Sequence, residues 1–327
     1  KRSGSMKGFD KHWKDFPDFI IGITNEIWES RRISNLHRYY SDDIPVRTPA
    51  GISQGNKETI ALTMGTLAEF PDRTLYGEDV IWSGSPEEGL HSSHRIFSTA
   101  THLGNGIFGK ATGKKLGYRI IADTHAINNQ INDEWLVRDQ GAIVRQIGWD
   151  PKDFAIDLIE REGGPEKCSK PFTPEIDLPG PYKGKGNQNE WGYKYADILT
   201  RIMNADMSVI PKEYDRACQL EQPGGVTGHS HKDADSFWMG LRASFPNAKF
   251  TIDHQIGLDD PMLSPRAAIR FGLYGKHDGW GTYGKPTGAK VYIMGICHAE
   301  FGPWGLRREF VLFDETSIWK QIVLQKG

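Results

Sequence analysis

The chain has 327 residues, with 40 Lys and Arg against 42 Asp and Glu, so its formal net charge is −2. This balance argues against a nucleic-acid or anionic membrane partner, because both are bound by a concentrated basic face. No apolar run approaches the ~18–20 residues that cross a bilayer, and the N-terminus lacks the apolar centre of a signal peptide. The cysteines Cys168, Cys218 and Cys297 form no paired metal or redox motif, which favours a reducing cytoplasm.

The first part of the chain predicts helices followed by strands. Residues 1–16 are expected to be a tag remnant and a tail, since "KRSGS" precedes Met6, which is expected to be native. A first domain is predicted over 17–150 and includes a helix at 57–70. Long strands are predicted at 74–82, 91–104, 114–127 and 132–139. Helices followed by antiparallel strands indicate an α+β fold, and the lack of strand–helix alternation disfavours a Rossmann fold.

A second domain is predicted over 190–327, after a linker at 151–189. The linker begins with "PKDFAIDLIEREGG", which predicts one short helix, and continues with a stretch rich in Pro, Gly and Lys. The second domain opens with an amphipathic helix. Its apolar residues recur at helical spacing: Trp191, Tyr195, Ile198, Leu199, Ile202 and Met203.

The two predicted domains repeat each other at an offset of 175 positions. The segment "VRDQGAIVRQI" at 137–147 lies over "LFDETSIWKQI" at 312–322, which aligns Asp139 with Asp314. The same offset aligns "GKATGKK" (109–115) with "GKPTGAK" (284–290), Glu134 with Glu309, Arg95 with Arg270, and His102 with His277. Matches that persist at one offset indicate a tandem duplication.

Strand alternation places acidic and imidazole side chains together on an otherwise apolar face of each domain. In the first domain, Asp123 and His125 share a face of one strand, and Trp135 and Asp139 share a face of the next. Such a set predicts a partly dry pocket for a small-molecule substrate, in which a carboxylate acts as a general base. The corresponding residues of the second domain are Tyr292, His298, Glu300, Phe310 and Asp314.

At these residues the chain resembles a known family. The stretches "RTPAG" (47–51), "AEFPDR" (68–73) and "DEWLVRDQGAIVRQIG" (133–148) resemble SnoaL-like polyketide cyclases of the nuclear transport factor 2-like, or ketosteroid-isomerase-like, superfamily. The resemblance covers both halves. It implies two tandem cone-shaped α+β barrels with helices packed on a curved antiparallel sheet. It also implies cofactor-independent enolate chemistry, such as cyclisation, isomerisation, dehydration or elimination, with an aspartate at the end of the last strand as the acid/base.

The resemblance assigns this role to Asp139 through the pattern W-x-x-x-D, and it assigns substrate polarisation to His125. The second half keeps Asp314 but has Phe310 at the Trp position and Glu300 at the His position, so the two pockets need not perform the same reaction. The expected catalytic residues are Asp139, His125, Asp314 and Glu300. The expected substrate-binding residues are Asp123, Trp135, Tyr292, His298 and Phe310.

Alternatives remain open on the residues alone. Asp139 and Asp314 would also fit a structural role, either capping the final turn or pairing with Arg145 and Lys320. A non-catalytic ligand-binding or interaction scaffold would use the same fold, and a water-activating hydrolase would use the same pocket.

No metal or other cofactor is expected. The histidine clusters "HSSH" (91–94) and "GHSHKD" (228–233) have no counterpart in the other repeat, and neither has a third ligand in view. "GKATGKK" lacks the spacing of a phosphate-binding loop, which favours a hairpin turn. The two halves are expected to form a pseudo-dimer within one chain, with homodimerisation as a further option.

Overall fold

The computed structural model describes residues 6–326, which divide into two compact units. The described residues of the first unit are 6–138, 142–149 and 172–184, and those of the second are 139–141, 150–171 and 185–326. Residues 1–5 of the expected tag remnant lie outside the described residues. Within 6–326, no helix is both long enough and apolar enough to cross a membrane.

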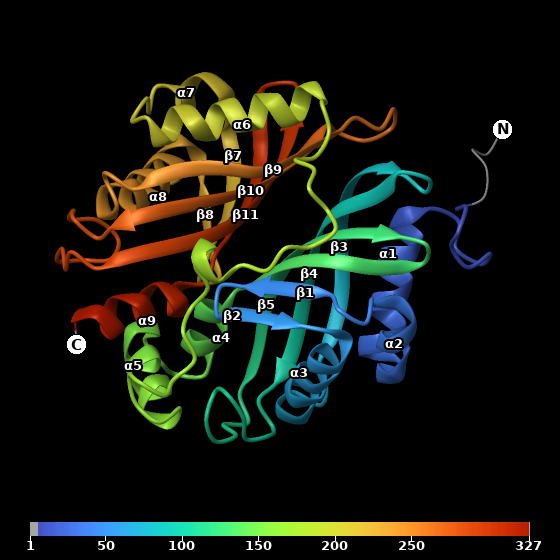
Figure 1. Ribbon diagram of the computed structural model, residues 1–327. Coiled ribbons are helices and arrows are strands. Elements are labelled where there is room, and N and C mark those ends of the chain that lie inside the picture. Colours follow the sequence, from blue (N-terminus) through green and yellow to red (C-terminus); the bar gives the residue numbers. More distant parts are fainter. Residues whose placement is uncertain (1–5, 327) are drawn as a thin grey trace. The chain divides into compact units, whose positions relative to one another are not determined.

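The first unit is built around a six-stranded sheet with the order β2-β1-β6-β5-β4-β3 (Figure 1). Neighbouring strands are antiparallel, except that β1 and β6 are parallel. The four long predicted strands are confirmed as β3 to β6, whereas the short β1 and β2 were not predicted. The bounds are β1 (Pro45–Thr48), β2 (Gly51–Gln54), β3 (Thr74–Ser85), β4 (Gly89–Thr101), β5 (Lys115–Ile127) and β6 (Gln130–Arg138).

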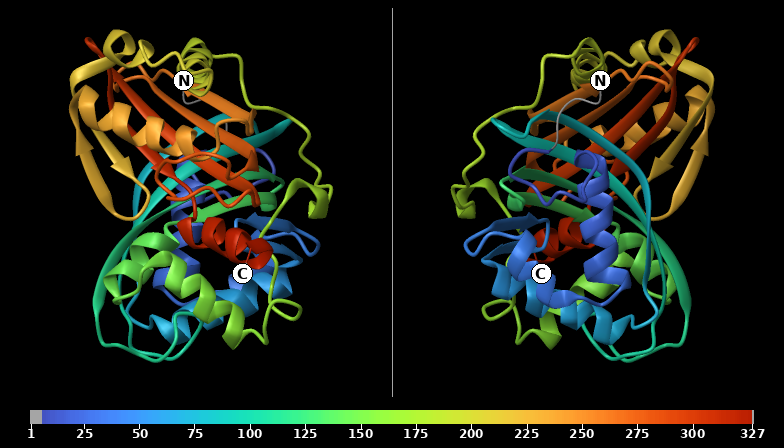
Figure 2. Two further views of the ribbon diagram at one scale, coloured as in Figure 1. Left: turned by 90° about the vertical axis from the view of Figure 1, so that its left-hand side faces the viewer. Right: turned by 90° about the vertical axis from the view of Figure 1, so that its right-hand side faces the viewer.

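The strands of the first sheet curve around the N-terminal helices (Figure 2). The first helix begins where the sequence favours it, because the Asp15 side chain accepts a hydrogen bond from the Asp18 N–H at 2.8 Å and Pro17 lies in the first turn. The helix predicted at 57–70 is confirmed as α3. The bounds are α1 (Phe16–Thr24), the π-helix η1 (Asn25–Glu29), the 3₁₀ helix η2 (Ile33–Asn35), α2 (Leu36–Tyr39), α3 (Asn56–Glu69) and, after β6, α4 (Gln140–Gln146).

The core of the first unit lies between these helices and one face of the sheet. Phe16, Phe19 and Ile20 of α1 pack in one cluster with Leu90 of β4 and Ala126 of β5. The cluster also includes residues that precede the expected start of the domain at residue 17, namely Met6, Phe9 and Trp13.

The second unit repeats this topology, with the strand order β8-β7-β12-β11-β10-β9. Among residues 6–326, no pairing joins β2 to β3 or β8 to β9, so each sheet is open rather than a closed barrel. The α+β class is therefore confirmed, with one parallel strand pair in each sheet. The strand bounds are β7 (Tyr214–Gln222), β8 (Val226–His229), β9 (Lys249–Leu258), β10 (Arg266–Lys276), β11 (Lys290–Gly302) and β12 (Gly305–Leu312).

The predicted amphipathic helix at 191–203 is confirmed as α6, which begins after Asn189, whose side chain accepts a hydrogen bond from the Trp191 N–H at 2.9 Å. Tyr195 and Ile198 of this helix enter the core of the second unit with Trp238 of α8. The helix bounds in this unit are α6 (Glu190–Met203), α7 (Val209–Glu213), α8 (Ser230–Ser244) and α9 (Glu315–Lys326).

The segment 151–189, expected to be a linker, contains more structure than its composition indicated. The predicted short helix is confirmed as α5 (Pro151–Arg161), with Asp150 as its N-cap. Residues 172–184 group with the first unit and include the 3₁₀ helix η3 (Pro174–Ile176). Whether 151–189 separates two independent domains stays a prediction.

Candidate functional site

Each sheet has two faces, and the side chains of each strand alternate between them. We call the face that meets the helices the helix side and the opposite face the outer side. In the first unit, Leu90 and Ala126 lie in the core with α1, which assigns the even-numbered residues of β4 and β5 to the helix side. The position of Arg73 supports this assignment. Its guanidinium lies 4.6 Å from the Trp28 ring of η1 and 5.9 Å from the ring of Tyr118, an even-numbered residue of β5.

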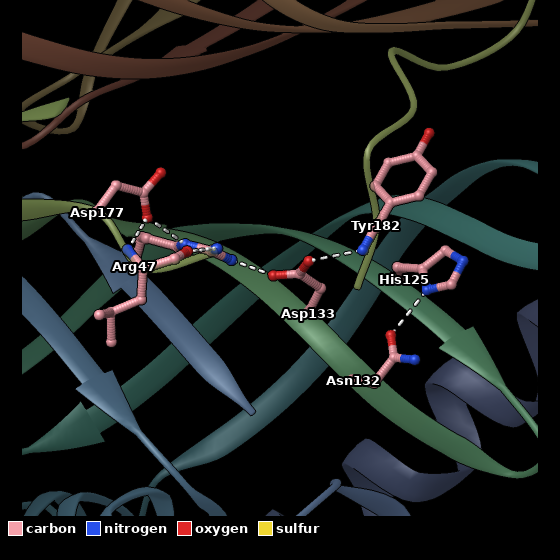
Figure 3. Close-up of polar contacts among 7 residues, drawn as sticks. Arg47, His125, Asn132, Asp133, Asp177 and Tyr182 are labelled. Atoms are coloured by element: carbon pink, nitrogen blue, oxygen red, sulfur yellow. Dashed lines mark hydrogen bonds and ion pairs between the residues drawn. The ribbon is translucent and has the colours of Figure 1, made fainter. Parts of the chain in front are cut away.

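The predicted site residues of the first unit lie on the outer side. Asp123 and His125 have odd numbers in β5, and Asp123 pairs with Trp135 of β6. His125 Nδ1 is 2.7 Å from Asn132 Oδ1, and its ring stacks on Tyr182 with 4.6 Å between centroids (Figure 3). Asp123, His125 and Trp135 therefore share one face, as predicted, but that face points away from the helices.

Residues 172–184 cover part of this outer side, and we call them the strap. Arg47 of β1 forms a buried ion pair with Asp133 of β6, donates from Nε to Asp177 at 2.8 Å, and donates from Nη2 to the Leu178 carbonyl at 2.6 Å (Figure 3). The Tyr182 N–H donates to Asp133 at 3.1 Å. The Arg47 guanidinium also lies 4.4 Å from the Trp135 ring. These contacts give Asp133 and Trp135 a structural role in holding the strap.

In the second unit the predicted residues Tyr292, His298 and Glu300 also lie on the outer side, because Cys297 and Ala299 of the same strand enter the core. His298 pairs with Phe310 across β11 and β12. Glu300 forms an ion pair with Arg307. The second unit therefore repeats the outcome of the first, with the predicted set on the side opposite the helices.

Asp139 and Asp314 follow the last strands, as the repeat predicted, and both are buried. Asp139 accepts hydrogen bonds from the Gly224 N–H at 2.9 and 3.1 Å. Asp314 caps α9, since it accepts from the N–H and hydroxyl groups of Thr316 and Ser317 at 2.6 to 3.2 Å. Burial raises the pKa of Asp314, against the lowering effect of these hydrogen bonds. The capping role anticipated as an alternative is thus present at Asp314, and the catalytic roles stay predictions.

The helix side of the first unit carries a buried carboxyl group that was not predicted to be functional. Glu134 of β6 pairs with Thr124 of β5 and is 5% exposed. Burial raises the pKa of Glu134 to about 8 from its usual 4.5, while a hydrogen bond from the Tyr40 hydroxyl acts in the opposite direction. Burial likewise raises the pKa of Tyr40 well above its usual value. Glu134 is therefore protonated at neutral pH and titrates close to it.

A hydrogen-bonded group lies beside Glu134 on the same side of the sheet. Ser92 Oγ is 2.7 Å from the Thr124 hydroxyl and 3.1 Å from Nδ1 of His94. Burial lowers the pKa of His94 to about 4, so its imidazole is neutral at pH 7. His94 pairs with Ala122, and Ala122 pairs with the partly exposed Leu136. The small Ala122 side chain thus separates His94 from Leu136 across the sheet.

Arginine side chains form the other end of this helix side. Arg73 is 4% exposed, and its Nε donates to Ser98 Oγ at 3.2 Å. Burial lowers the pKa of Arg73 to about 10; a hydrogen bond to Tyr118 raises it, and the like charge of Arg138 lowers it. Nη1 of Arg73 and Nε of Arg138 are buried, and neither has a hydrogen-bond partner within residues 6–326.

The second unit has an apolar core at the equivalent positions, 175 residues later. The counterpart of Glu134 is Glu309, which accepts from Tyr195 at 2.6 Å, Tyr214 at 2.7 Å and Trp238 at 3.3 Å. Burial raises its pKa to about 7. The replacements are Ala248 for Arg73, Ala267 for Ser92, Ile269 for His94, Leu273 for Ser98, Ile293 for Tyr118, Ala299 for Thr124 and Phe313 for Arg138, all in the buried core.

This comparison identifies the signal that sequence reasoning missed. The alignment of Glu134 with Glu309 is visible in the repeat, where by itself it supports only the duplication. Polar residues of the first unit that are replaced in the second, such as His94 and Arg138, distinguish the polar interior of the first unit from the apolar core of the second.

The histidine clusters do not form a metal centre in the described part of the chain, where no three His, Cys, Asp or Glu side chains are grouped to hold an ion. His91 and His94 are three positions apart in β4, so they point to opposite sides of the sheet. His231 Nε2 donates to the Tyr214 carbonyl at 2.7 Å, and Asp233 accepts from the His229 N–H at 2.7 Å.

Comparison with known proteins relates part of the chain to one family. Residues 18–147 match the model of SnoaL-like polyketide cyclases. Among solved structures, IdmH of Streptomyces antibioticus is 20% identical over 41% of this chain and 98% of its own, with a TM-score of 0.35. A SnoaL-like polyketide cyclase of Agrobacterium tumefaciens is 16% identical over 45% of this chain and 100% of its own, with a TM-score of 0.34. No curated protein sequence matches the chain.

Proposed function

We propose that the first unit, whose residues 18–147 match the model of SnoaL-like polyketide cyclases, performs acid/base catalysis on its helix side. The reaction is the removal and return of a proton at a carbon next to a carbonyl group, without a cofactor. The observation that carries the proposal is the buried carboxyl of Glu134, whose pKa of about 8 lies close to neutral pH.

Glu134 is suited to both directions of proton transfer. Near pH 8 its protonated and ionised forms are both populated, so it accepts a proton from carbon and returns it to another atom of the same substrate. Tyr40 keeps its proton because its pKa is raised well above the usual value, and its hydroxyl therefore remains a donor that orients the carboxyl.

His94 provides a neutral hydrogen-bonding group on the same side of the sheet. Its hydrogen bond to Ser92, which in turn contacts Thr124, fixes the position of the imidazole. A neutral imidazole beside a substrate carbonyl donates a hydrogen bond to the carbonyl oxygen without adding a charge. The second unit lacks this group, since Ile269 and Ala299 occupy the positions of His94 and Thr124, so we assign catalysis to the first unit.

The proposal is tested by deuterium exchange at the carbon next to the carbonyl of β-tetralone, followed by proton NMR. We expect Glu134→Gln to slow the protein-catalysed exchange by about 10²-fold or more, the usual contribution of a general base. We also expect the wild-type rate to rise with pH through about 8, as Glu134 ionises, and this rise to be absent from Glu134→Gln.

Two variants serve as controls. Glu309→Gln changes the equivalent carboxyl of the second unit and is expected to leave the exchange rate unchanged in folded protein. Asp139→Asn tests the aspartate that the family resemblance favoured. If Asp139→Asn abolishes exchange while Glu134→Gln keeps it, or if the wild-type protein does not accelerate exchange, the assignment to Glu134 is wrong.

A further inference from the structure

We infer that Arg73 and Arg138 form a binding site for a carboxylate group of the substrate, on the helix side of the first unit. The inference deepens the proposed function by naming the class of substrate, an elongated organic anion. The inference rests on the proposed function only in treating the bound anion as a substrate, because the binding of an anion is measurable without turnover.

The Arg73 guanidinium is held in place on several sides. Its Nε donates to Ser98 Oγ at 3.2 Å, and the rings of Trp28 and Tyr118 lie 4.6 and 5.9 Å from its centre. Its Nη1 is buried with no hydrogen-bond partner in residues 6–326. A fixed guanidinium with one unused donor is suited to bind a carboxylate, because its N–H groups match the spacing of two oxygen atoms.

Arg138 provides the second cation. It lies opposite Ile120 in β5, two residues along that strand from Tyr118, and its charge is close enough to lower the pKa of Arg73. Its Nε is also buried and unpartnered in the described chain. Two like charges this close repel each other, and an anion bound between them would remove that repulsion.

The charged groups acting on Arg73 strengthen this argument. Burying a cation without an anion destabilises the fold, so buried charges are normally paired. Apart from burial, Tyr118 raises the pKa of Arg73, whereas the two cations Arg138 and Arg31 lower it. In the second unit the same positions hold Ala248 and Phe313, so the fold itself does not need arginines there.

The distance to Glu134 sets the length of the ligand. Glu134 and Arg138 are four residues apart on one side of β6, which corresponds to about 13 Å along an extended strand. A ligand whose carboxylate contacts Arg138 and whose reacting carbon contacts Glu134 must therefore span on the order of 10 Å, the length of a fused-ring molecule.

The test compares naphthoate with naphthamide, its uncharged analogue, by isothermal titration calorimetry. We expect the wild-type protein to bind naphthoate at least about tenfold more tightly than naphthamide, since a hydrogen bond to a charged group is stronger than one to a neutral group. Arg73→Gln and Arg138→Gln should each weaken naphthoate binding by about tenfold or more while changing naphthamide binding by less than about threefold.

Arg119→Gln is the matched control, because Arg119 lies on the outer side of β5 and pairs with Glu78 at 2.8 Å. It should bind naphthoate as the wild type does. If Arg73→Gln fails to fold, two other variants test the same site: Arg138→Gln, at a partly exposed residue, and Ser98→Ala. Equal affinity of the wild type for both ligands, or an equal loss in Arg119→Gln, overturns the inference. Neither result bears on Glu134, whose role is measured by proton exchange.

Discussion

Glu134 and Glu309 occupy the same register position in two copies of one sheet, yet their surroundings differ. Glu134 pairs with Thr124 and receives a hydrogen bond from Tyr40, whereas Glu309 pairs with Ala299 and accepts from Tyr195, Tyr214 and Trp238. The residues at 20 and 63, equivalent to Tyr195 and Trp238, are Ile and Thr, which cannot supply the same donors. Glu309 thus accepts hydrogen bonds from three core residues, whereas Glu134 lies in a polar interior.

Glu309→Ala should destabilise the second unit strongly, because it removes the acceptor of the buried Tyr195 and Tyr214 hydroxyls. Trp238 Nε1 also loses Glu309 but keeps Tyr214 Oη as an acceptor at 3.2 Å. We expect a loss of roughly 3 kcal/mol or more in the free energy of unfolding, measured by chemical denaturation. Tyr195→Phe removes a single hydrogen bond and should cost about 1 kcal/mol. A loss at Glu309→Ala no larger than that of Tyr195→Phe would contradict the structural role of this network.

Glu134→Gln should change how stability depends on pH. The folded pKa of Glu134, about 8, is above its usual 4.5, so between these values the unfolded chain is ionised while the folded protein keeps its proton. The stability contributed by the neutral carboxyl is complete below pH 4.5 and is lost as the pH rises to about 8. The wild type should therefore lose roughly 3 to 5 kcal/mol relative to Glu134→Gln over this interval.

Denaturation midpoints of both proteins, measured from pH 4 to pH 9, give this difference directly. Parallel curves for the two proteins would mean that Glu134 does not titrate with a raised pKa.

Gly180→Ala should detach the strap from the first unit. A Cβ atom at Gly180 would lie 2.0 Å from Asp133 Oδ2, inside the carboxylate that also binds Arg47 and the Tyr182 N–H. We expect faster amide hydrogen exchange throughout 172–184, because breaking one partner of a buried ion pair costs about 3 to 5 kcal/mol. Gly65→Ala is the control, since Gly65 lies in α3 and the added Cβ would meet no atom within 4 Å apart from its chain neighbours and the nearby backbone of its own helix.

The control should be neutral or stabilising by about 0.5–1 kcal/mol, because alanine is favoured over glycine inside a helix. Unchanged exchange of 172–184 in Gly180→Ala would mean that the strap is not held through Asp133.

Asp314→Ala should release the first turn of α9. Its carboxylate accepts hydrogen bonds from the N–H groups of Thr316 and Ser317 at 2.8 and 3.2 Å, and losing an N-cap costs about 1 to 2 kcal/mol. Hydrogen exchange at the start of α9 and thermal unfolding measure the effect. If Asp314→Asn keeps full stability but lowers the exchange rate of β-tetralone, the second aspartate is catalytic and the capping interpretation is incomplete.

The sequence by itself determined the α+β class and the four long strands of the first unit, and it predicted the repeat at an offset of 175. It also sorted side chains correctly into alternating sets, since Asp123, His125 and Trp135 do share a face. These features depend on local periodicity and on comparing the chain with itself, so one sequence is enough to find them.

Only the tertiary structure decided which face of each sheet meets the helices. Alternation along a strand sorts its residues into two sets, but it does not say which set faces the interior. That depends on the side of the sheet on which helices from elsewhere in the chain pack. That choice moved the candidate site from His125 to Glu134, His94 and Arg73. It likewise decided that 172–184 is a strap. Arg47 and Asp133, which form a buried ion pair, are distant from this segment in sequence, and they hold it through hydrogen bonds with Asp177, Leu178 and Tyr182.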